Sequence, residues 1–334
     1  MSIPKEFKKK RILFSFTLGF GLLAFFLYQS DLKEIWEQVK EAEFLPIALA
    51  FLLHYSTYLV RGYRWKQILT KIGFKGSSWG LGKITLIFQS VDCIVPAKLG
   101  DLYGAHLVKL NYNFSRSSSL GSIVLQRFLD AAGNFFLMVG AVFFLFGRKV
   151  PSQMVSLIHW SVGFILTGTL IGVLFLWKSG WFSRHLPEKL QVLIESFKEG
   201  LRPKMRTLPL LTGLTLLIWL LEAGRFYCIC QSINVAAGFP SAIIISLLAA
   251  LATAIPFTPS GLGAVELVMV NLMTLLDFPS GPIKYSIIIL DRLVSYWSQI
   301  PIGLITLGVS SYSGMKIWNL QEGTKTKSYQ EVNP

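Results

Sequence analysis

Eight long apolar segments restrict what this chain can fold into. They cover approximately residues 12–29, 44–60, 81–108, 118–146, 154–177, 207–234, 240–277 and 283–311. A helix needs about 20 apolar residues to span a bilayer, and in lipid only helices and closed barrels satisfy all of their backbone hydrogen bonds. Only 15% of the 334 residues are charged, whereas soluble domains average about 25%. The sequence therefore predicts an all-α polytopic membrane protein.

Two of these segments are interrupted in the same way. Residues 96–100 read Pro-Ala-Lys-Leu-Gly, and residues 259–263 read Pro-Ser-Gly-Leu-Gly. A carboxylate follows each break, and an arginine comes 26 residues after each carboxylate. We expect Asp101 to form an ion pair with Arg127, and Glu266 with Arg292. Charges at membrane depth are costly and usually functional, and a repeated unit with glycine and proline breaks indicates a transporter-type site. The alternative is chance similarity, because the match is only five residues long.

The distribution of Lys and Arg decides how the two interrupted segments cross the membrane. If both are single spans and the N-terminus is cytoplasmic, 16 basic residues lie inside and 12 outside. If both are re-entrant hairpins, 23 lie inside and 5 outside. Cytoplasmic loops carry the excess of positive charge. We therefore predict about six full spans and two re-entrant hairpins, with both termini and loop 178–206 cytoplasmic and loops 235–239 and 278–282 outside.

This topology makes the two hairpins an inverted repeat, because the first enters from the cytoplasm and the second from outside. We divide the chain into a cytoplasmic N-terminus (1–11), one transmembrane domain (12–315) and a cytoplasmic tail (316–334). The repeat cores cover about 44–177 and 207–311. Within the basic linker 178–206, residues 190–201 have the pattern of an amphipathic helix on the cytoplasmic surface. Residues 31–43 predict a similar short helix outside, although both could be plain connectors.

Charged pairs inside the apolar segments have two interpretations. Arg127 and Asp130 are three residues apart, as are Glu222 and Arg225, so each pair shares a helix face. Asp291 and Arg292 are adjacent and need different partners. The pairs are either buried ion pairs that fix helix packing, or a carboxylate holds each arginine until a lipid phosphate replaces it.

Two further groups have open interpretations. Arg61, Arg64, Trp65 and Lys66 follow the second segment, as either a positive-inside anchor or a headgroup site. Asp101 and Glu266 would sit in the first turns of half-helices, as either caps or a proton or cation site. The predicted headgroup-binding or gating residues are Arg61, Arg64, Lys98, Asp101, Arg127, Asp130, Glu222, Arg225, Glu266 and Arg292. The predicted hairpin breaks are Pro96, Gly100, Pro259, Gly261 and Gly263.

Enzyme and cofactor signals are absent from the sequence. No Walker A motif, His-Glu-x-x-His or Gly-x-Ser-x-Gly occurs, and the four histidines have no metal-ligand spacing. We expect no cofactor, no metal and no catalytic residue. The net charge of +14 comes from loops that flank the membrane, which favours anionic lipid over nucleic acid as the partner.

Five motifs together resemble the lysylphosphatidylglycerol synthase transmembrane-region family, also described as flippase-like. The motifs are Arg61-Gly-Tyr-Arg-Trp, Pro96-Ala-Lys-Leu-Gly-Asp, Gln126-Arg-Phe-Leu-Asp, Pro259-Ser-Gly-Leu-Gly-Ala-Val-Glu and Asp291-Arg-Leu-Val-Ser-Tyr-Trp. The resemblance covers about residues 10–315. The family includes the membrane half of the multiple peptide resistance factor. The chain departs from the family pattern at Gln126, where Glu is common, and at Lys98 and Asp101, where Arg and Glu are usual.

The resemblance implies a translocase of the inner membrane that moves a lipid with a phosphate headgroup between leaflets. The lipid would be an anionic or aminoacylated phospholipid, or a polyprenyl-phosphate-linked lipid. The family's soluble aminoacyltransferase domain is not expected here, so synthase activity does not carry over. Two alternatives stay open: a membrane-embedded lipid transferase, and a non-transporting partner of a lipid-modifying enzyme or glycosyltransferase. The sequence does not give the lipid, the direction of movement, the energy source or the oligomeric state.

Overall fold

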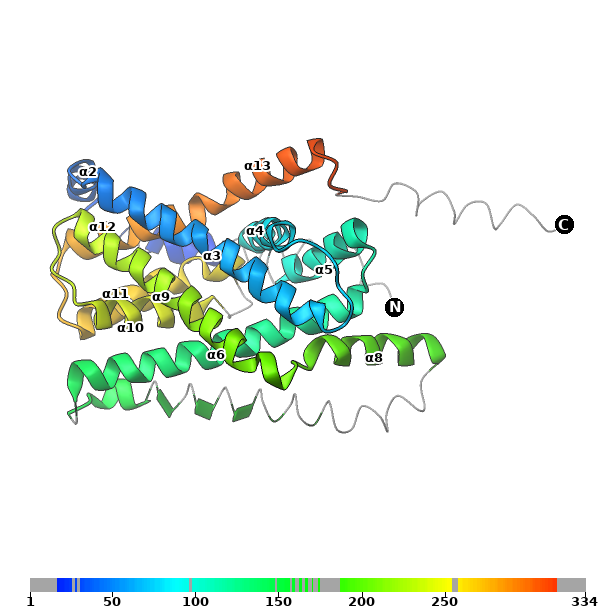
Figure 1. Ribbon diagram of the computed structural model, residues 1–334. Coiled ribbons are helices and arrows are strands. Elements are labelled where there is room, and N and C mark those ends of the chain that lie inside the picture. Colours follow the sequence, from blue (N-terminus) through cyan, green and yellow to red (C-terminus); the bar gives the residue numbers. More distant parts are fainter. Residues whose placement is uncertain are drawn as a thin grey trace.

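The computed structural model describes residues 17–25, 28, 31–95, 98–147, 149–156, 158–159, 162–163, 166–167, 170, 174, 187–253 and 258–316. These residues form helices joined by short loops, and no strand occurs among them (Figure 1). The predicted all-α class is therefore confirmed. The predicted N-terminal segment 1–11 and nearly all of the tail 316–334 lie outside the described residues.

Four helical stretches are long and apolar enough to cross a membrane: Phe44–Thr70, Arg116–Phe146, Leu190–Ser232 and Pro282–Tyr312. The first two are the continuous helices α3 (Phe44–Thr70) and α6 (Arg116–Phe146). The third contains part of α8 (Glu188–Leu201), the 3-10 turn η1 (Met205–Thr207) and α9 (Leu208–Ser232), and the fourth consists of α12 (Pro282–Arg292), the π-helical turn η3 (Leu293–Trp297) and α13 (Gln299–Tyr312). They match four of the six predicted full spans. The other two, 12–29 and 154–177, fall mostly outside the described residues.

The two interrupted segments each fold into a pair of short helices packed side by side. The first pair is α4 (Ser78–Ile94) with α5 (Leu99–Tyr112); the second is α10 (Phe239–Ala252) with α11 (Ala264–Leu275), joined through the 3-10 turn η2 (Pro259–Gly261). Helices of 12 to 17 residues are only about 18–26 Å long, less than the roughly 30 Å of a bilayer's hydrocarbon core. Neither half can span alone, so the predicted hairpin form is confirmed for both segments.

The backbone turns sharply at each hairpin tip. Lys98 precedes α5 in the left-handed conformation, with φ 54° and ψ 34°. Gly261 lies 163 residues later, at the matching position of the second break, and has φ 74°. Gly100 is required for another reason: a Cβ there would lie 2.1 Å from the carbonyl oxygen of Phe88 in α4. Pro96 lies outside the described residues.

The same helix contacts occur in both halves of the molecule: a contact made by a helix of the first copy has a counterpart made by the equivalent helix of the second copy. α3 packs along α9, α4 packs against α13, and α10 packs against α6. Each hairpin also packs against the long helix before it, α4 on α3 and α10 on α9. In Figure 1, α4 and α5 lie near one end of the long helices, and α10 and α11 lie near the other. This arrangement is that of an inverted repeat, whose hairpin tips meet where α4 contacts η2.

The two predicted amphipathic segments are helices. α2 (Leu32–Lys40) begins at Asp31, whose side chain accepts hydrogen bonds from two backbone N–H groups, and buries Ile35 against the apolar core. α8 runs alongside the first part of α6, so close that Gly200 lies against the backbone of Ser118 (Figure 1). The packing face of α8 is therefore used against a neighbouring helix.

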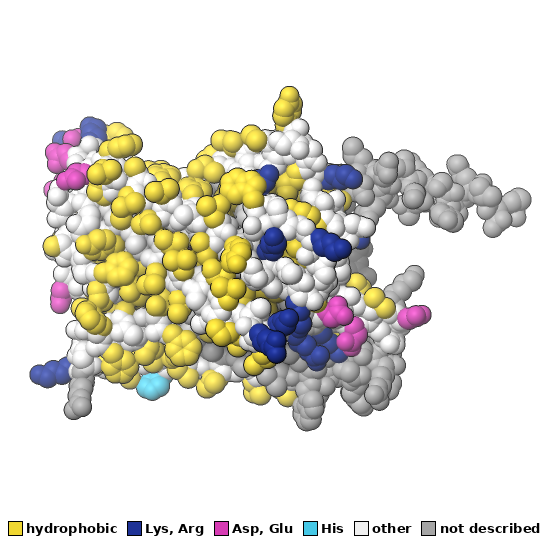
Figure 2. Space-filling view, viewed as in Figure 1, with side chains coloured by type: hydrophobic (Ala, Val, Ile, Leu, Met, Phe, Trp, Pro, Cys, Tyr) yellow, Lys and Arg dark blue, Asp and Glu magenta, His cyan; other side chains and the backbone are white. Residues whose placement is uncertain are grey.

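Charged side chains lie mostly toward the two ends of the molecule, and apolar side chains cover the surface between them. Figure 2 shows most of the visible Lys and Arg side chains gathered toward one end, Asp and Glu side chains at both ends, and hydrophobic side chains over most of the surface between. Hydrophobic side chains exposed on the long helices include Leu52, Leu59, Phe136 and Phe144. Such a belt fits the hydrocarbon of a bilayer.

Candidate functional site

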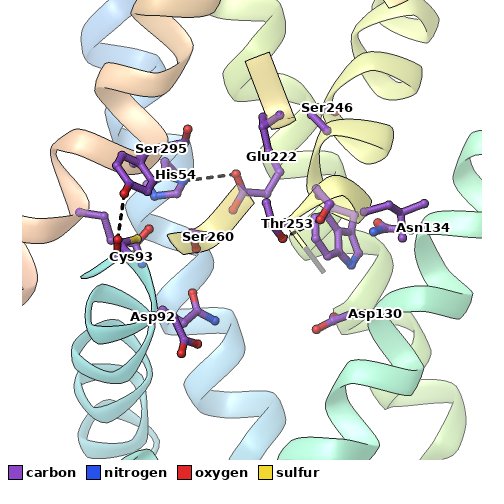
Figure 3. A pocket seen from close by; sticks show the side chains of 18 of the residues that line it. His54, Asp92, Cys93, Asp130, Asn134, Glu222, Ser246, Thr253, Ser260 and Ser295 are labelled. Atoms are coloured by element: carbon purple, nitrogen blue, oxygen red, sulfur yellow. Dashed lines mark hydrogen bonds and ion pairs between the residues drawn. The ribbon is translucent and has the colours of Figure 1, made fainter. Parts of the chain in front are cut away.

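A cavity of about 430 Å³ lies where the hairpin tips meet α3, α6 and α9 (Figure 3). Five cations and five carboxylates line it: Arg61, Lys98, Arg127, Arg225, Arg292, Asp92, Asp101, Asp130, Glu222 and Asp291. Eight of the ten predicted headgroup or gating residues are among them, and Arg64 and Glu266 stand behind the wall. The volume of this cavity is large enough for a small ligand or a lipid headgroup.

The first copy of the repeat places its ion pair at the cavity surface. Arg127 Nη2 donates to Asp101 Oδ1 at 2.7 Å, as predicted, and lies 3.8 Å from Asp92 Oδ2. The Arg127 side chain is 39% exposed and the Asp101 side chain 18%. Asp92 Oδ1 accepts from the backbone N–H of Gly100 at 2.8 Å, which fixes the start of α5. Arg127 therefore keeps donors that face open space.

The second copy buries the equivalent pair. Arg292 Nε donates to Glu266 Oε1 at 2.8 Å, again as predicted, but the two side chains are only 8% and 2% exposed. Glu266 Oε2 also accepts from the backbone N–H of Gly263 at 2.7 Å and so caps α11. The ring of Tyr296 covers the guanidinium, with its centroid 4.5 Å from Arg292 Cζ. Arg292 reaches the cavity wall, whereas Glu266 does not.

The helix starts explain why both carboxylates find an arginine. Asp101 is the third residue of α5, and Glu266 is the third residue of α11. Both the carboxylates and their arginines are therefore related by 165 residues. The breaks themselves match at 163 residues, because α11 begins two residues later in its copy than α5 does. For Glu266 the capping interpretation is confirmed; Asp101 makes no capping hydrogen bond.

The arginines of α3 point into the bundle, which rules out the surface-anchor interpretation for Arg61 and Arg64 and leaves the headgroup interpretation as a prediction. Arg64 is 1% exposed and donates to Asp130 Oδ1 at 2.6 Å, to Asp130 Oδ2 at 3.2 Å and to Thr215 at 2.7 Å. Trp65 is buried and donates to Ser122 at 2.8 Å. α3 continues to Thr70 rather than ending near residue 60, which carries these residues inside.

The same contacts correct the predicted pairing of Arg127 with Asp130. Although the two residues share a face of α6, Asp130 receives its hydrogen bonds from Arg64, while Arg127 turns to Asp101. Arg61 is held more loosely, 4.0 Å from Asp130 Oδ2 and 3.5 Å from Glu222 Oε1. Its Nε has no hydrogen-bond partner among the described residues.

A second network lies at the other side of the cavity. Arg225 Nε donates to Glu222 Oε2 at 3.1 Å, which confirms the predicted pair, and its Nη1 donates to Asp291. Adjacent residues Asp291 and Arg292 therefore have different partners, as expected. His54 Nδ1 lies 3.2 Å from Glu222 Oε2 (Figure 3).

Sequence reasoning missed several cavity residues. The histidines appeared scattered, yet His54, Tyr58 and Arg61 follow the i, i+4, i+7 spacing of one helix face and all line the cavity. That spacing was the available signal. Asn134 and Trp219 also line the cavity. Asn134 lies four residues after Asp130 and Trp219 three residues before Glu222, so helix-face spacing was the available signal for them as well.

Direct contacts join the two halves at the tips. The hydroxyl of Tyr296, in η3, donates to the carbonyl of Cys93 at the end of α4 at 2.8 Å. Tyr55 and Ser298 are hydrogen-bonded at 2.7 Å. A π-helical turn beside Arg292 is an irregularity often found at functional sites. Among the described residues, no group of three His, Cys, Asp or Glu could hold a metal ion.

A family model described as the lysylphosphatidylglycerol synthase TM region matches residues 12–303. The chain belongs to this family. Membership in the lysylphosphatidylglycerol synthase TM-region family, together with the four long apolar helices, makes the protein an integral membrane protein. The sequence-based resemblance is thereby confirmed.

Three relatives of this family member are archaeal proteins. A UPF0104 membrane protein of Methanocaldococcus jannaschii is 32% identical over 218 residues, which is 64% of this chain and 92% of that protein. A UPF0104 membrane protein of Methanothermobacter thermautotrophicus is 26% identical, over 89% of this chain and 92% of that protein. The glycosyltransferase AglD of Haloferax volcanii is 24% identical over 127 residues, which is 38% of this chain and 20% of AglD.

Proposed function

We propose that the protein moves a lipid with a phosphate headgroup between the two leaflets of the cytoplasmic membrane, with both of its termini in the cytoplasm. Arg127 binds the phosphate in the central cavity. The observation that carries this proposal is the partly exposed Arg127–Asp101 pair inside a bundle whose outer surface is apolar. An ionised arginine held at membrane depth and open to a cavity is a functional group by default.

The hydrogen-bonding capacity of the arginines supports this choice. A guanidinium has five N–H donors, and Arg127 uses one nitrogen for Asp101. The side chains of Arg61, Arg225 and Arg292 are all less than a tenth exposed. A phosphate that replaces Asp101 would receive two parallel hydrogen bonds from the Arg127 fork, which an ammonium cannot supply. Lys98 and Arg61 line the same cavity and would contribute positive charge.

The hairpins give a physical route for the headgroup. Each leads from one end of the bundle to the cavity, and irregular backbone within a membrane is tolerated where it lines such a cavity. Rocking one copy of the repeat against the other would open the cavity to each leaflet in turn. The acyl chains would stay in lipid beside the hydrophobic belt, and only the headgroup would cross.

Reconstitution tests the proposal. Purified protein in vesicles should move fluorescently labelled phosphatidylglycerol between leaflets, followed by quenching of the outer leaflet. Arg127→Ala should slow movement by roughly tenfold to hundredfold, because a hydrogen bond to a charged group is worth about 1.5–3 kcal/mol. Arg127→Lys should fall between, because it keeps the charge without the fork.

The matched control is Arg206→Ala, which removes an exposed arginine in η1, just before α9. Its rate should equal that of the unchanged protein. If the unchanged protein moves no lipid, or if Arg127→Ala moves lipid at the normal rate, the proposal is wrong.

The likeness to glycosyltransferase AglD favours a second candidate function. Over 38% of its length this chain is similar to part of a glycosyltransferase. The alternative is therefore a membrane partner of a glycosyltransferase that presents a polyprenyl-phosphate-linked lipid without moving it. Such a protein would bind the lipid through Arg127 but leave its leaflet distribution unchanged in the vesicle assay.

A further inference from the structure

His54 is a buried histidine that the lipid-binding proposal does not use. It lies in α3 with 4% of its surface exposed and lines the cavity. Its Nδ1 faces Glu222 Oε2 at 3.2 Å, whereas its Nε2 is buried without a hydrogen-bond partner among the described residues. A buried polar nitrogen without a partner is costly in an apolar protein and calls for a functional explanation.

The charges around the cavity are balanced without this histidine. Six cations and six carboxylates lie in the wall or directly behind it: Arg61, Arg64, Lys98, Arg127, Arg225 and Arg292, against Asp92, Asp101, Asp130, Glu222, Glu266 and Asp291. Entry of a lipid phosphate adds one negative charge. An uncompensated charge in a poorly solvated site is strongly unfavourable. The cavity is therefore more stable if it takes up a proton when the headgroup enters.

His54 is the group best placed to accept that proton. Its free Nε2 carries the lone pair when Nδ1–H faces Glu222, and protonation leaves an imidazolium 3.2 Å from the Glu222 carboxylate. Histidine is the side chain that ordinarily changes charge between about pH 5 and 8. Asp130, Glu222, Glu266 and Asp291 each keep a cation beside them, so protonating one of these would weaken an existing pair. Asp92 and Asp101 both lie beside Arg127, which turns to the phosphate, so they are the rival proton sites that the His54→Gln variant distinguishes from His54.

The other charged groups that face His54 come from three sides. On α3 the imidazole packs edge-to-face against the rings of Tyr55 and Tyr58. Arg61 lies one helical turn after Tyr58. From α9 and α12, Glu222, Arg225 and Asp291 form the network described above. Asp92 and Asp130 lie across the cavity (Figure 3). The nearest of these to the imidazole is the Glu222 carboxylate, at 3.2 Å from Nδ1.

We propose that His54 is a proton-binding site of the cavity, and that it takes up one proton with each anionic headgroup. This rests on the proposed function. The proton comes from the buffered solvent, whose acid form gives it up, and adds to the Nε2 lone pair; no covalent bond between heavy atoms forms or breaks. Because coupling is reciprocal, a proton on His54 also strengthens headgroup binding, so a proton gradient can bias lipid movement.

Calorimetry on the purified full-length chain in detergent tests this. The probe is dihexanoyl-phosphatidylglycerol, whose phosphodiester keeps one negative charge across the pH range used. Binding heats in two buffers with different ionisation enthalpies give the number of protons taken up. The unchanged protein should take up about one proton per lipid near neutral pH, and its affinity should rise by as much as about tenfold per unit fall in pH.

His54→Gln should still bind the lipid but take up close to no proton, and its affinity should lose most of the pH dependence. His54→Asn serves as a second replacement if the glutamine variant does not fold. His159→Gln changes an exposed histidine away from the cavity and should behave as the unchanged protein. Lipid binding without proton uptake, or unchanged uptake in His54→Gln, overturns this inference alone. No binding by the unchanged protein overturns the proposed function with it.

Discussion

The two hairpins build the same ion pair, but one is open and the other is closed. In the first copy, Arg127 is 39% exposed and Asp101 18%. In the second copy, Arg292 is 8% exposed and Glu266 2%. Each carboxylate is the third residue of its helix, and each arginine follows 26 residues later. The repeat therefore duplicates a scaffold, and only one copy of that scaffold leaves its arginine available to a ligand.

Helix capping explains the difference. Glu266 binds Arg292 with one oxygen and the Gly263 N–H with the other, so both oxygens are fixed. In the first copy Asp92 takes the backbone N–H of Gly100 instead, and Asp101 has only Arg127 to hold. A carboxylate that is not needed as a cap can release its arginine at lower cost. The ligand site is therefore expected in the first copy.

The largest expected effect is a difference in the free energy of unfolding between the Arg292→Ala and Arg127→Ala variants. Arg292→Ala leaves Glu266 buried without its cation, which typically costs about 3–5 kcal/mol. Arg127→Ala removes a partly exposed charge and should cost about 1 kcal/mol or less. Unfolding in detergent, followed by circular dichroism for both variants, measures the difference. Equal losses would mean that the two copies are equally structural.

The sequence could predict a feature when the residues that form it are close in the chain or fixed in spacing, and could not when they come from separate helices. The hairpins, the inverted repeat and both carboxylate–arginine pairs follow from local breaks and fixed spacing, so they were predictable. The partners of Arg64 and Asp130 were not, because they sit on different helices and α3 runs about ten residues further than its apolar stretch. His54 was overlooked because its partner Glu222 is 168 residues away.

Substitutions at the two hairpin tips should change the stability of the fold by smaller amounts, and in opposite directions in the two copies. Lys98 holds a left-handed backbone that glycine adopts without cost, so Lys98→Gly should stabilise the fold by about 1 kcal/mol. Gly261→Ala should destabilise it by about 2 kcal/mol, because its φ is 74° and the new Cβ would lie 2.8 Å from Val265 Cγ2.

The same unfolding measurement checks both tip variants. Stabilisation by Lys98→Gly with slower lipid movement would mean that Lys98 is kept for its charge at the expense of stability. If Lys98→Gly instead destabilises the protein, the lysine side chain stabilises the tip and the two breaks are more alike than we infer.

The comparison depends on the two hairpins entering from opposite faces of the membrane, and cysteine labelling tests this most directly. Lys75 is exposed just before α4, and Ser280 is exposed just after α11, while the native Cys93, Cys228 and Cys230 are buried. In intact cells an impermeant maleimide should label Ser280→Cys, and it should label Lys75→Cys only after the membrane is opened. Labelling of both from the same side would contradict the inverted repeat and the shared cavity built on it.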